Sequence, residues 1–182
     1  MRLQPWILAA AALATAGCGD DGGGDDAIAT KAPEDAARIR LSSPAFIDGS
    51  RLPKQYTCDG AGTEPLMQAG TVPASTKELV LTVADPDAPG GSFVHVTRFG
   101  LSHRGQGTVS EGGTEGRNTK GTIGWTPPCP PRGDGPHRYV WTVYALRDAS
   151  GLERGAEPAE VGAVVEKGVL ARGTITATYG RE

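Results

Sequence analysis

Two proline-rich segments interrupt the apolar runs of this chain and constrain its fold more than any other feature. The first reads DPDAP at residues 85–89, with His95 shortly after it, and the second reads PPCPPRGDGPHRY at residues 127–139. Proline fixes φ and removes a backbone donor, so neither segment can be helical and each predicts a stiff turn. One such turn alone would favour simple stiffening of a hairpin. Two of them, each with a histidine at a strand edge, favour a preformed site for a small ligand.

Apolar, β-branched runs on either side of these turns predict a mostly β fold with minor α. Residues 78–83 read ELVLTV and end at the Asp-Pro breaker, which is typical of a buried strand. Residues 93–101, 138–146 and 173–179 have the same character. We therefore expect two packed, mainly antiparallel sheets with one or two small helices at one end.

Helical periodicity is confined to residues 158–171, where apolar residues recur at three- and four-residue spacings. This pattern predicts one helix near the C-terminus, followed by a final strand. Five aromatic side chains are predicted to belong to the core rather than to a ligand platform: Phe46, Phe93, Phe99, Trp125 and Trp141.

The first eighteen residues have the layout of an export signal, with a short positive start, an apolar stretch and small residues before Cys18. A cysteine in this place resembles the bacterial lipobox, which predicts a signal peptide at residues 1–17 and lipidation of Cys18. An ordinary secretory signal that leaves Cys18 free is the alternative. The sequence thus predicts a membrane-anchored lipoprotein of the cell envelope, held outside the cytoplasm in the periplasm or at the surface.

Residues 18–37 are rich in Gly and Asp, with DDGGGDD at residues 20–26, and predict a flexible tether. A calcium loop is the alternative, but the ligand spacing and terminal Glu of an EF-hand are missing. Residues 38–182 then have the size of one domain. The net charge is −3 and the 18 Lys and Arg residues are scattered, so no nucleic-acid partner is expected.

Cys58 and Cys129 remain if Cys18 carries a lipid. In an oxidising compartment an even pair of cysteines commonly closes a disulfide, which predicts a Cys58–Cys129 bridge. Two buried free thiols are the alternative.

An ordered set of motifs resembles the phosphatidylethanolamine-binding protein family, and more closely its bacterial branch of Raf kinase inhibitor-like proteins. The motifs are LSSPAF at residues 41–46, DG at 48–49, YTCDG at 56–60, PL at 65–66, DPDAP at 85–89, His95, PCPP at 128–131 and GPHRYVW at 135–141. The resemblance covers residues 41–181. It implies a large central β-sheet packed on a smaller one, a C-terminal helical element, and a cavity at the sheet edge for phosphate-like anions or a phospholipid headgroup.

Carried over to this chain, the resemblance predicts a ligand pocket from eight residues: Asp85, Asp87, His95, Pro128, Cys129, Pro130, His137 and Tyr139. The chain departs from the bacterial pattern at Met67, Gln68, Val96, Gly100, Ser102 and Pro127. These departures affect the walls of the predicted cavity more than its charged groups.

The residue types of this pocket predict an anion site tuned by carboxylates. A carboxylate beside His95 or His137 favours the imidazolium and raises the pKa of the histidine. That cation, the backbone amides of residues 128–135 and the hydroxyl of Tyr139 would then face the anion.

Three functions compete at this level. The leading prediction is a binding module for a small anionic or phosphorylated ligand. The alternative is a protein-interaction module such as a protease inhibitor, because the resemblance includes inhibitors; a hydrolase that uses Asp and His is the third. The sequence lacks G-x-S-x-G, P-loop and H-E-x-x-H motifs, so we expect neither an enzyme nor a cofactor nor a metal site.

Overall fold

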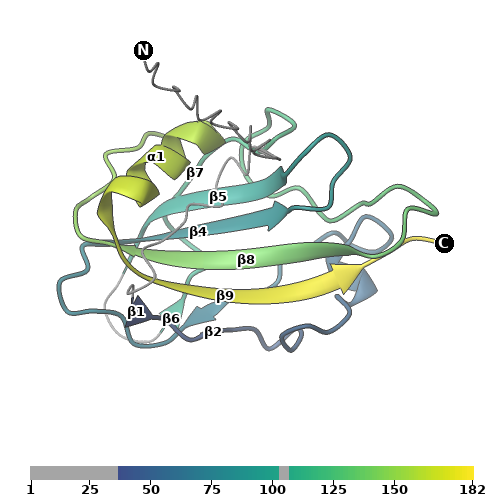
Figure 1. Ribbon diagram of the computed structural model, residues 1–182, viewed down its shortest axis with the longest axis horizontal. Coiled ribbons are helices and arrows are strands. Elements are labelled where there is room, and N and C mark those ends of the chain that lie inside the picture. Colours follow the sequence, from purple (N-terminus) through teal and green to yellow (C-terminus); the bar gives the residue numbers. More distant parts are fainter. Residues whose placement is uncertain (1–36, 103–106) are drawn as a thin grey trace, which may run out of the picture.

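The computed structural model describes residues 37–102 and 107–182, which form two β-sheets and one α-helix (Figure 1). The predicted signal peptide, Cys18 and the predicted tether up to residue 36 lie outside the described residues. Ala37, the last residue of that predicted tether, begins the first strand of the fold. The described part of the chain contains no helix that is long and apolar enough to cross a membrane.

The large sheet has six strands, and the small sheet has three. In spatial order the large sheet contains β1 (Ala37–Arg38), β9 (Val169–Tyr179), β8 (His137–Leu146), β4 (Glu78–Asp85), β5 (Phe93–Leu101) and β7 (Thr114–Glu115). The small sheet contains β2 (Leu41–Ser42), β3 (Gln68–Ala69) and β6 (Gly107–Thr108). All neighbours are antiparallel except β1 and β9. The predicted mostly β fold, with a large sheet packed on a smaller one, is confirmed.

The main core lies between the two sheets, and a second cluster lies under the helix. Trp141 is fully buried and contacts Phe46, with ring centroids 4.8 Å apart. On the outer face of the large sheet, α1 (Pro158–Gly168) buries Val161 and Val165 against Phe99. Trp125 is partly buried and packs against the main core, whereas Phe93 is partly buried and belongs to neither cluster, so the assignment of Phe93 to the core is wrong. A short 3-10 helix, η1 (Lys54–Tyr56), completes the fold.

The helix prediction is correct at its start and too long at its end. α1 begins with Pro158, a position where a missing N–H costs nothing, and the side chain of Glu160 accepts the Glu157 amide at 2.7 Å. The helix ends at Gly168, and Val169 already has extended backbone angles and pairs with Leu146 of β8. Pairing along β8 therefore outweighs the helical spacing of Val169 and the residues after it.

The antiparallel arrangement brings both proline-rich segments to one end of the large sheet. β4 ends at Asp85, β5 begins opposite it at Phe93, and β8 begins at His137 on the other side of β4. In Figure 1 this end lies near the C-terminus, and the end with β1 and α1 lies opposite. Strand order and register thus determine where the candidate site lies.

Candidate ligand-binding site

A cavity of about 260 Å³ opens at this end of the large sheet. Six of the eight predicted pocket residues line it: Asp85, His95, Cys129, Pro130, His137 and Tyr139. Asp87 and Pro128 do not line it, and their contacts show why.

The aspartate turn, residues 85–91, forms one wall of the cavity and is fastened to β8 through its two carboxylates. Oδ1 of Asp85 accepts the amide of Asp87 at 2.9 Å, while Oδ2 lies 2.8 Å from Nδ1 of His137. Asp87 accepts three hydrogen bonds from Arg138, from its backbone amide, Nε and Nη2. The Arg138 hydrogen bonds lower the pKa of Asp87 against an opposing effect of burial. Asp87 therefore attaches the aspartate turn to β8 through Arg138. It does not line the cavity, so its predicted place in the pocket is wrong.

His137 has carboxylates at both ring nitrogens. Nδ1 contacts the buried Asp85, and Nε2 lies 3.3 Å from Oδ2 of the half-exposed Asp134. Burial lowers the pKa of His137, but hydrogen bonds and charges from both carboxylates outweigh it, so the net pKa is raised. This is the carboxylate-supported imidazolium that the sequence predicts for His95 or His137.

His95 has the opposite environment. Its Nδ1 lies 2.7 Å from the carbonyl oxygen of Thr126, which can only accept, so Nδ1 carries the hydrogen and Nε2 is an acceptor. Burial lowers the pKa of His95 to about 4, despite the bond to Thr126. Nε2 is buried and has no partner among the described residues. A predicted imidazolium at His95 is wrong, because the residue beside it is a neutral carbonyl and not a carboxylate.

Tyr139 contributes a donor to the floor of the cavity. Its hydroxyl is buried, and no described residue meets hydrogen-bond geometry with it. Burial, together with the charge of Asp85, raises the pKa of Tyr139, so the hydroxyl stays protonated. Its ring lies edge-on to His95, with centroids 5.3 Å apart. The lining thus includes a buried hydroxyl and a buried imidazole nitrogen that form no hydrogen bond of standard geometry with a described residue.

The proline wall, residues 125–131, closes the other side of the cavity. A disulfide joins Cys58 to Cys129, and the amide of Cys58 donates to the carbonyl of Pro128 at 3.0 Å. Nε1 of Trp125 donates to the carbonyl of Gly62 at 2.9 Å. Pro128 thus takes part in the attachment of this wall, and it is not among the residues that line the cavity.

Two of the loop amides that were predicted to face an anion are used within the protein. Gly133 and Asp134 donate their amides to the carbonyls of Arg181 and Pro131, at 3.0 and 3.4 Å. Prolines occupy positions 127, 128, 130 and 131, so most of this wall has no N–H to offer. Side chains, rather than loop amides, supply the polar groups of the cavity.

Several lining residues were missed by sequence reasoning: Ala88, Pro89, Phe93, Lys120, Thr126 and Pro127. Lys120 belongs to a loop that Asn118 organises. Oδ1 of Asn118 accepts the amide of Lys120 at 3.0 Å, and Nδ2 donates to Oγ1 of Thr126 at 2.9 Å. NTKG at residues 118–121 signals a turn, yet nothing in it indicates that the turn meets the cavity.

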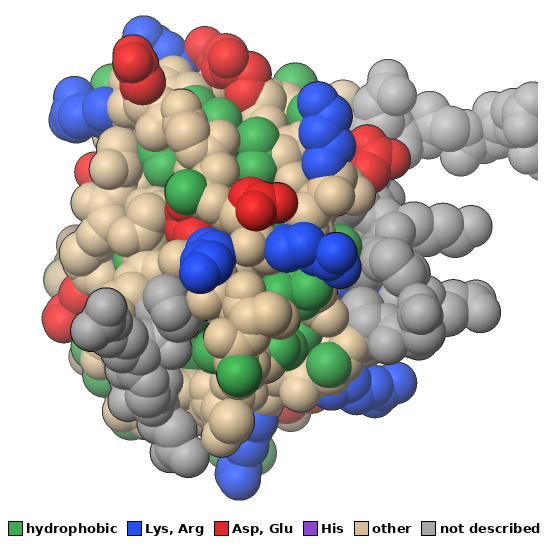
Figure 2. Space-filling model, turned by 90° about the vertical axis from the view of Figure 1, so that its left-hand side faces the viewer, with side chains coloured by type: hydrophobic (Ala, Val, Ile, Leu, Met, Phe, Trp, Pro, Cys, Tyr) green, Lys and Arg blue, Asp and Glu red, His purple; other side chains and the backbone are tan. Residues whose placement is uncertain are grey.

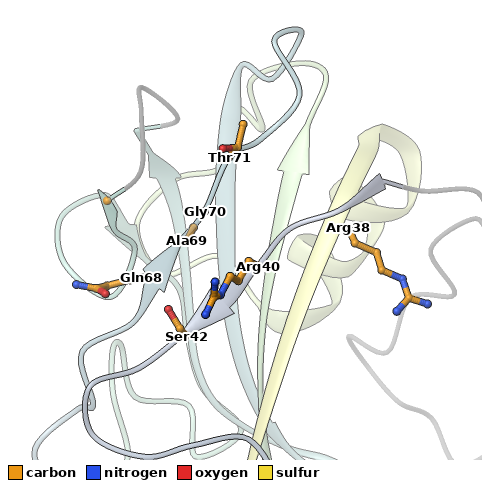
Figure 3. Close-up of a pocket in the computed structure, with 8 residues that line it drawn as sticks. Arg38, Arg40, Ser42, Gln68, Ala69, Gly70 and Thr71 are labelled. Carbon is orange, nitrogen blue, oxygen red and sulfur yellow. The ribbon is translucent and has the colours of Figure 1, made fainter.

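A larger hollow of about 630 Å³ lies beside β2 and β3, at the end of the molecule away from the histidines. Figure 3 shows Arg38 pointing away from Ser42 and Gln68, so the polar side chains that line this hollow do not converge on one point. Among residues 37–102 and 107–182 no group of three or more His, Cys, Asp or Glu side chains could hold a metal ion. The cavity with the two histidines is therefore the better candidate site.

Known proteins share this fold and sequence. A protein of Mycobacterium tuberculosis that bears a lipoprotein name, LppC, is 33% identical over 198 aligned positions, which cover 98% of this chain and 97% of LppC. A crystal structure from Chlamydia trachomatis, described as a phosphatidylethanolamine-binding protein homolog, has a TM-score of 0.73 at 32% identity. It covers 81% of this chain and 100% of its own. YbcL of Escherichia coli, described as a member of the mammalian PEBP family, has a TM-score of 0.72 at 28% identity and covers 80% of this chain and 100% of its own.

The family model described as phosphatidylethanolamine-binding protein matches residues 42–180. This range includes both proline-rich segments, both histidines of the cavity and the bridge between Cys58 and Cys129. The family resemblance of the sequence motifs is confirmed, and the chain belongs to the phosphatidylethanolamine-binding protein family.

Proposed function

We propose that this protein is a lipid-anchored binding protein, outside the cytoplasm, whose cavity holds the phosphate group of a small molecule or a lipid headgroup without turning it over. The observation that carries the proposal is the pair of buried, unpartnered atoms at the cavity, Oη of Tyr139 and Nε2 of His95. Buried polar atoms without partners are rare in folded proteins and cost free energy, so a ligand that satisfies both is favoured.

The chemistry of these atoms narrows the ligand. Tyr139 donates and a protonated His137 is positively charged, which suits an oxyanion, and Lys120 adds a further cation. His95 accepts, so the ligand must also carry a hydrogen-bond donor. A singly protonated phosphate or phosphomonoester has both, and so does a phosphodiester with an ammonium group. Sulfate has only acceptors.

Calorimetric titration of the full-length protein tests this proposal. We expect inorganic phosphate and phosphoethanolamine to bind and sulfate to bind at least about tenfold more weakly, because a missing hydrogen bond to a charged ligand costs about 1.5–3 kcal/mol. Tyr139→Phe should lower the affinity for inorganic phosphate by a similar factor. Tyr56→Phe, which removes a hydroxyl outside the cavity, should leave the affinity unchanged. Equal affinities for phosphate and sulfate, or an inert Tyr139→Phe variant, would contradict the proposal.

Phosphate affinity should also fall as the pH rises. The pKa of His137 is raised, so its imidazolium persists above its ordinary range and is lost as the pH rises through that raised pKa. Titrations at mildly acidic and mildly alkaline pH measure this loss. His137→Gln removes the charge and should flatten the dependence; a slope that persists in this variant would show that the ligand, not His137, titrates.

The lipid anchor rests on the small residues before Cys18 and on the lipoprotein name of the M. tuberculosis relative. Expression in a bacterium followed by mass spectrometry of the membrane fraction should show a mature chain that starts at a lipid-modified Cys18. Cys18→Ala should abolish the modification and move the protein to the soluble fraction. Soluble wild-type protein with a free Cys18 would show an ordinary secretory signal instead.

A further inference from the structure

We propose a second anion site, separate from the ligand cavity, that binds a compact polyvalent oxyanion with two adjacent anionic groups, such as a diphosphate. It lies between η1 and the end of β9, in a hollow of about 270 Å³. Four cations line this hollow, and we call them the basic cluster: Arg51, Lys54, Arg132 and Arg181.

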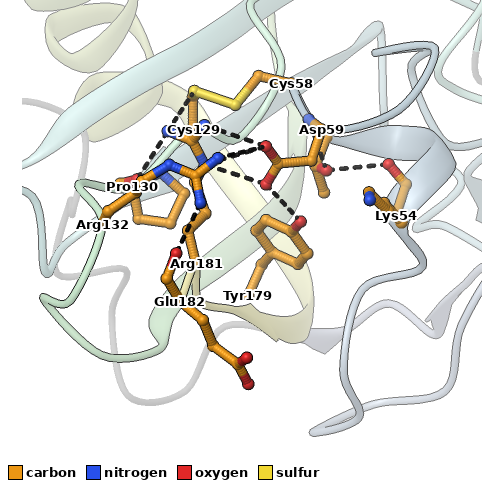
Figure 4. A network of polar contacts seen from close by, with 10 residues as sticks. Lys54, Cys58, Asp59, Cys129, Pro130, Arg132, Tyr179, Arg181 and Glu182 are labelled. Carbon is orange, nitrogen blue, oxygen red and sulfur yellow. Dashed lines mark hydrogen bonds and ion pairs between the residues drawn. A yellow bond between two sulfur atoms is a disulfide. The ribbon is translucent and has the colours of Figure 1, made fainter.

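Asp59 lies within the basic cluster, and two partners already occupy its carboxylate. Nε and Nη2 of Arg181 donate to it at 3.0 Å each, and the hydroxyl of Tyr179 donates at 2.8 Å (Figure 4). These hydrogen bonds, Arg181 first, lower the pKa of Asp59 and keep it ionised. Nη2 of Arg132 is 3.9 Å from the same carboxylate, which is the limit of an ion pair. Asp59 therefore neutralises Arg181 and little else.

Arg51 is positioned by an uncharged group, whereas Arg132 lies between Asp59 and Glu182, the last residue of the chain. The guanidinium of Arg51 lies 5.6 Å from the centroid of the Tyr179 ring, a cation–π distance. Nη1 of Arg132 donates to the backbone oxygen of Glu182 at 2.6 Å. Neither Arg51 nor Lys54 forms an ion pair with any described residue. The side chain of Arg51 is thus held in place without being neutralised, which lowers the entropy cost of binding an anion.

Charge in this hollow contrasts with the rest of the molecule. Its lining has four basic side chains against two acidic ones and the α-carboxylate of Glu182, an excess of one positive charge, whereas the whole chain has a net charge of −3. On the face shown in Figure 2, acidic and basic side chains are interspersed. A local excess of guanidinium groups, whose planar donors match oxyanions, favours phosphate-type ligands.

The shape of the hollow favours more than one oxyanion group. A second hollow of about 270 Å³ continues it toward Gly135 and Pro136 and shares Arg51, Tyr179 and Arg181 with it. The ligand cavity lies on the other side of the proline wall. Arg181 contacts this wall from outside, with Nη1 3.5 Å from the carbonyl of Pro130. No residue lines both the basic cluster's hollow and the ligand cavity, so the two sites can be tested separately.

The test is calorimetric titration of inorganic pyrophosphate into the full-length protein, with a Tyr139→Phe background to disable the ligand cavity. The double variant Arg51→Gln, Lys54→Gln should weaken pyrophosphate at least about tenfold, since each lost cation removes charge-assisted hydrogen bonds. The control Arg147→Gln, Lys167→Gln removes the same charge from exposed positions at the opposite end and should have no such effect. Thermal unfolding confirms that both variants fold.

Three results would overturn the proposal. Pyrophosphate could fail to bind at millimolar concentration. It could lose its affinity in the Tyr139→Phe background, which would place it in the ligand cavity. The control could weaken binding as much as the cluster variant, which would make the effect one of overall charge.

Discussion

The two walls of the ligand cavity are held by different chemistry. The aspartate turn is attached to β8 by carboxylates, through His137 and Arg138. The proline wall is attached to the loop after η1 by a disulfide at Cys129 and by a neutral hydrogen bond from Trp125. Charge pairs respond to pH and disulfides respond to reductant. The same cavity can therefore be loosened from either side by a different change in conditions.

The two histidines of the cavity differ in charge, as the attachments of the two walls do. His137 belongs to the charged wall and has a raised pKa, whereas His95 is bonded to Thr126 in the proline wall and has a pKa of about 4. Burial lowers the pKa of both histidines, and only at His137 do neighbouring carboxylates outweigh it.

The largest effect is expected from the covalent attachment of the proline wall. Cys58→Ser, Cys129→Ser should lower the free energy of unfolding by about 4 kcal/mol, because the bridge closes a long loop. Denaturant titration of the variant and of reduced wild type measures this loss, and the two should agree. An oxidised, denatured wild-type protein with reactive thiols at both positions would show that the bridge does not form.

A somewhat smaller loss of unfolding free energy is expected when the charged attachment of the aspartate turn is removed. Asp85→Ala removes one partner of a buried pair and should cost about 3 kcal/mol of unfolding free energy. Asp87→Ala is the matched control, since its pair with Arg138 is more exposed and should cost less than about 1 kcal/mol. If both variants lost the same stability, the burial of the Asp85–His137 pair would carry no special weight.

Stability should respond to pH with opposite signs at the two walls. Neutral His95 stabilises the folded protein fully above its ordinary pKa of 6.5, and this contribution is lost as the pH falls toward 4. Charged His137 stabilises it fully below 6.5, and this contribution is lost as the pH rises through its raised pKa. NMR titration of both imidazoles checks the order: His137 should titrate above 6.5 and His95 near 4. Two titrations near 6.5 would remove the contrast between the walls.

The smallest loss of unfolding free energy is expected when the uncharged hydrogen bond that attaches the proline wall is removed. Trp125→Phe keeps most of the ring but loses the hydrogen bond to Gly62, which should cost about 1 kcal/mol. Denaturant unfolding measures it, with Trp141→Phe as a comparison that also leaves the core underpacked. A loss as large as that of Asp85→Ala would mean that neutral bonds hold this wall as firmly as charge holds the other.

Local patterns predicted most of the fold because strand and turn signals agreed with the tertiary structure. Residues 93–101 form β5 as expected, and 78–83 and 138–146 lie within β4 and β8. The error at residues 169–171 arose where helical spacing and β-branched character compete, and pairing with β8 decided between them. The intrinsic preference of a residue for helix or strand predicts its structure poorly where the segment can pair with a neighbouring strand of the sheet.

The candidate site was predictable only in its residue types. Motifs brought Asp85, His137 and Tyr139 to one cavity, but whether Asp87 faces it depended on Arg138, the next residue after His137. Lys120 belongs to a loop with no chemical signature of its own. The neutral state of His95 depended on its burial, and its tautomer depended on the carbonyl of Thr126, a backbone atom that leaves no trace in side-chain patterns.

The edge of β9 that faces away from β8 bears on whether copies of this protein can associate through their sheets. The chain from Ala37 to Leu52 follows this edge: Ala37 and Arg38 pair with its beginning, and the amide of Thr176 donates to Asp48. Further along, Gly49 and Leu52 donate to its carbonyls. A long, open strand edge invites edge-to-edge aggregation, and here short local segments occupy its hydrogen-bonding groups. A polar, threonine-rich strand can therefore lie at the margin of the sheet without recruiting another copy of the protein.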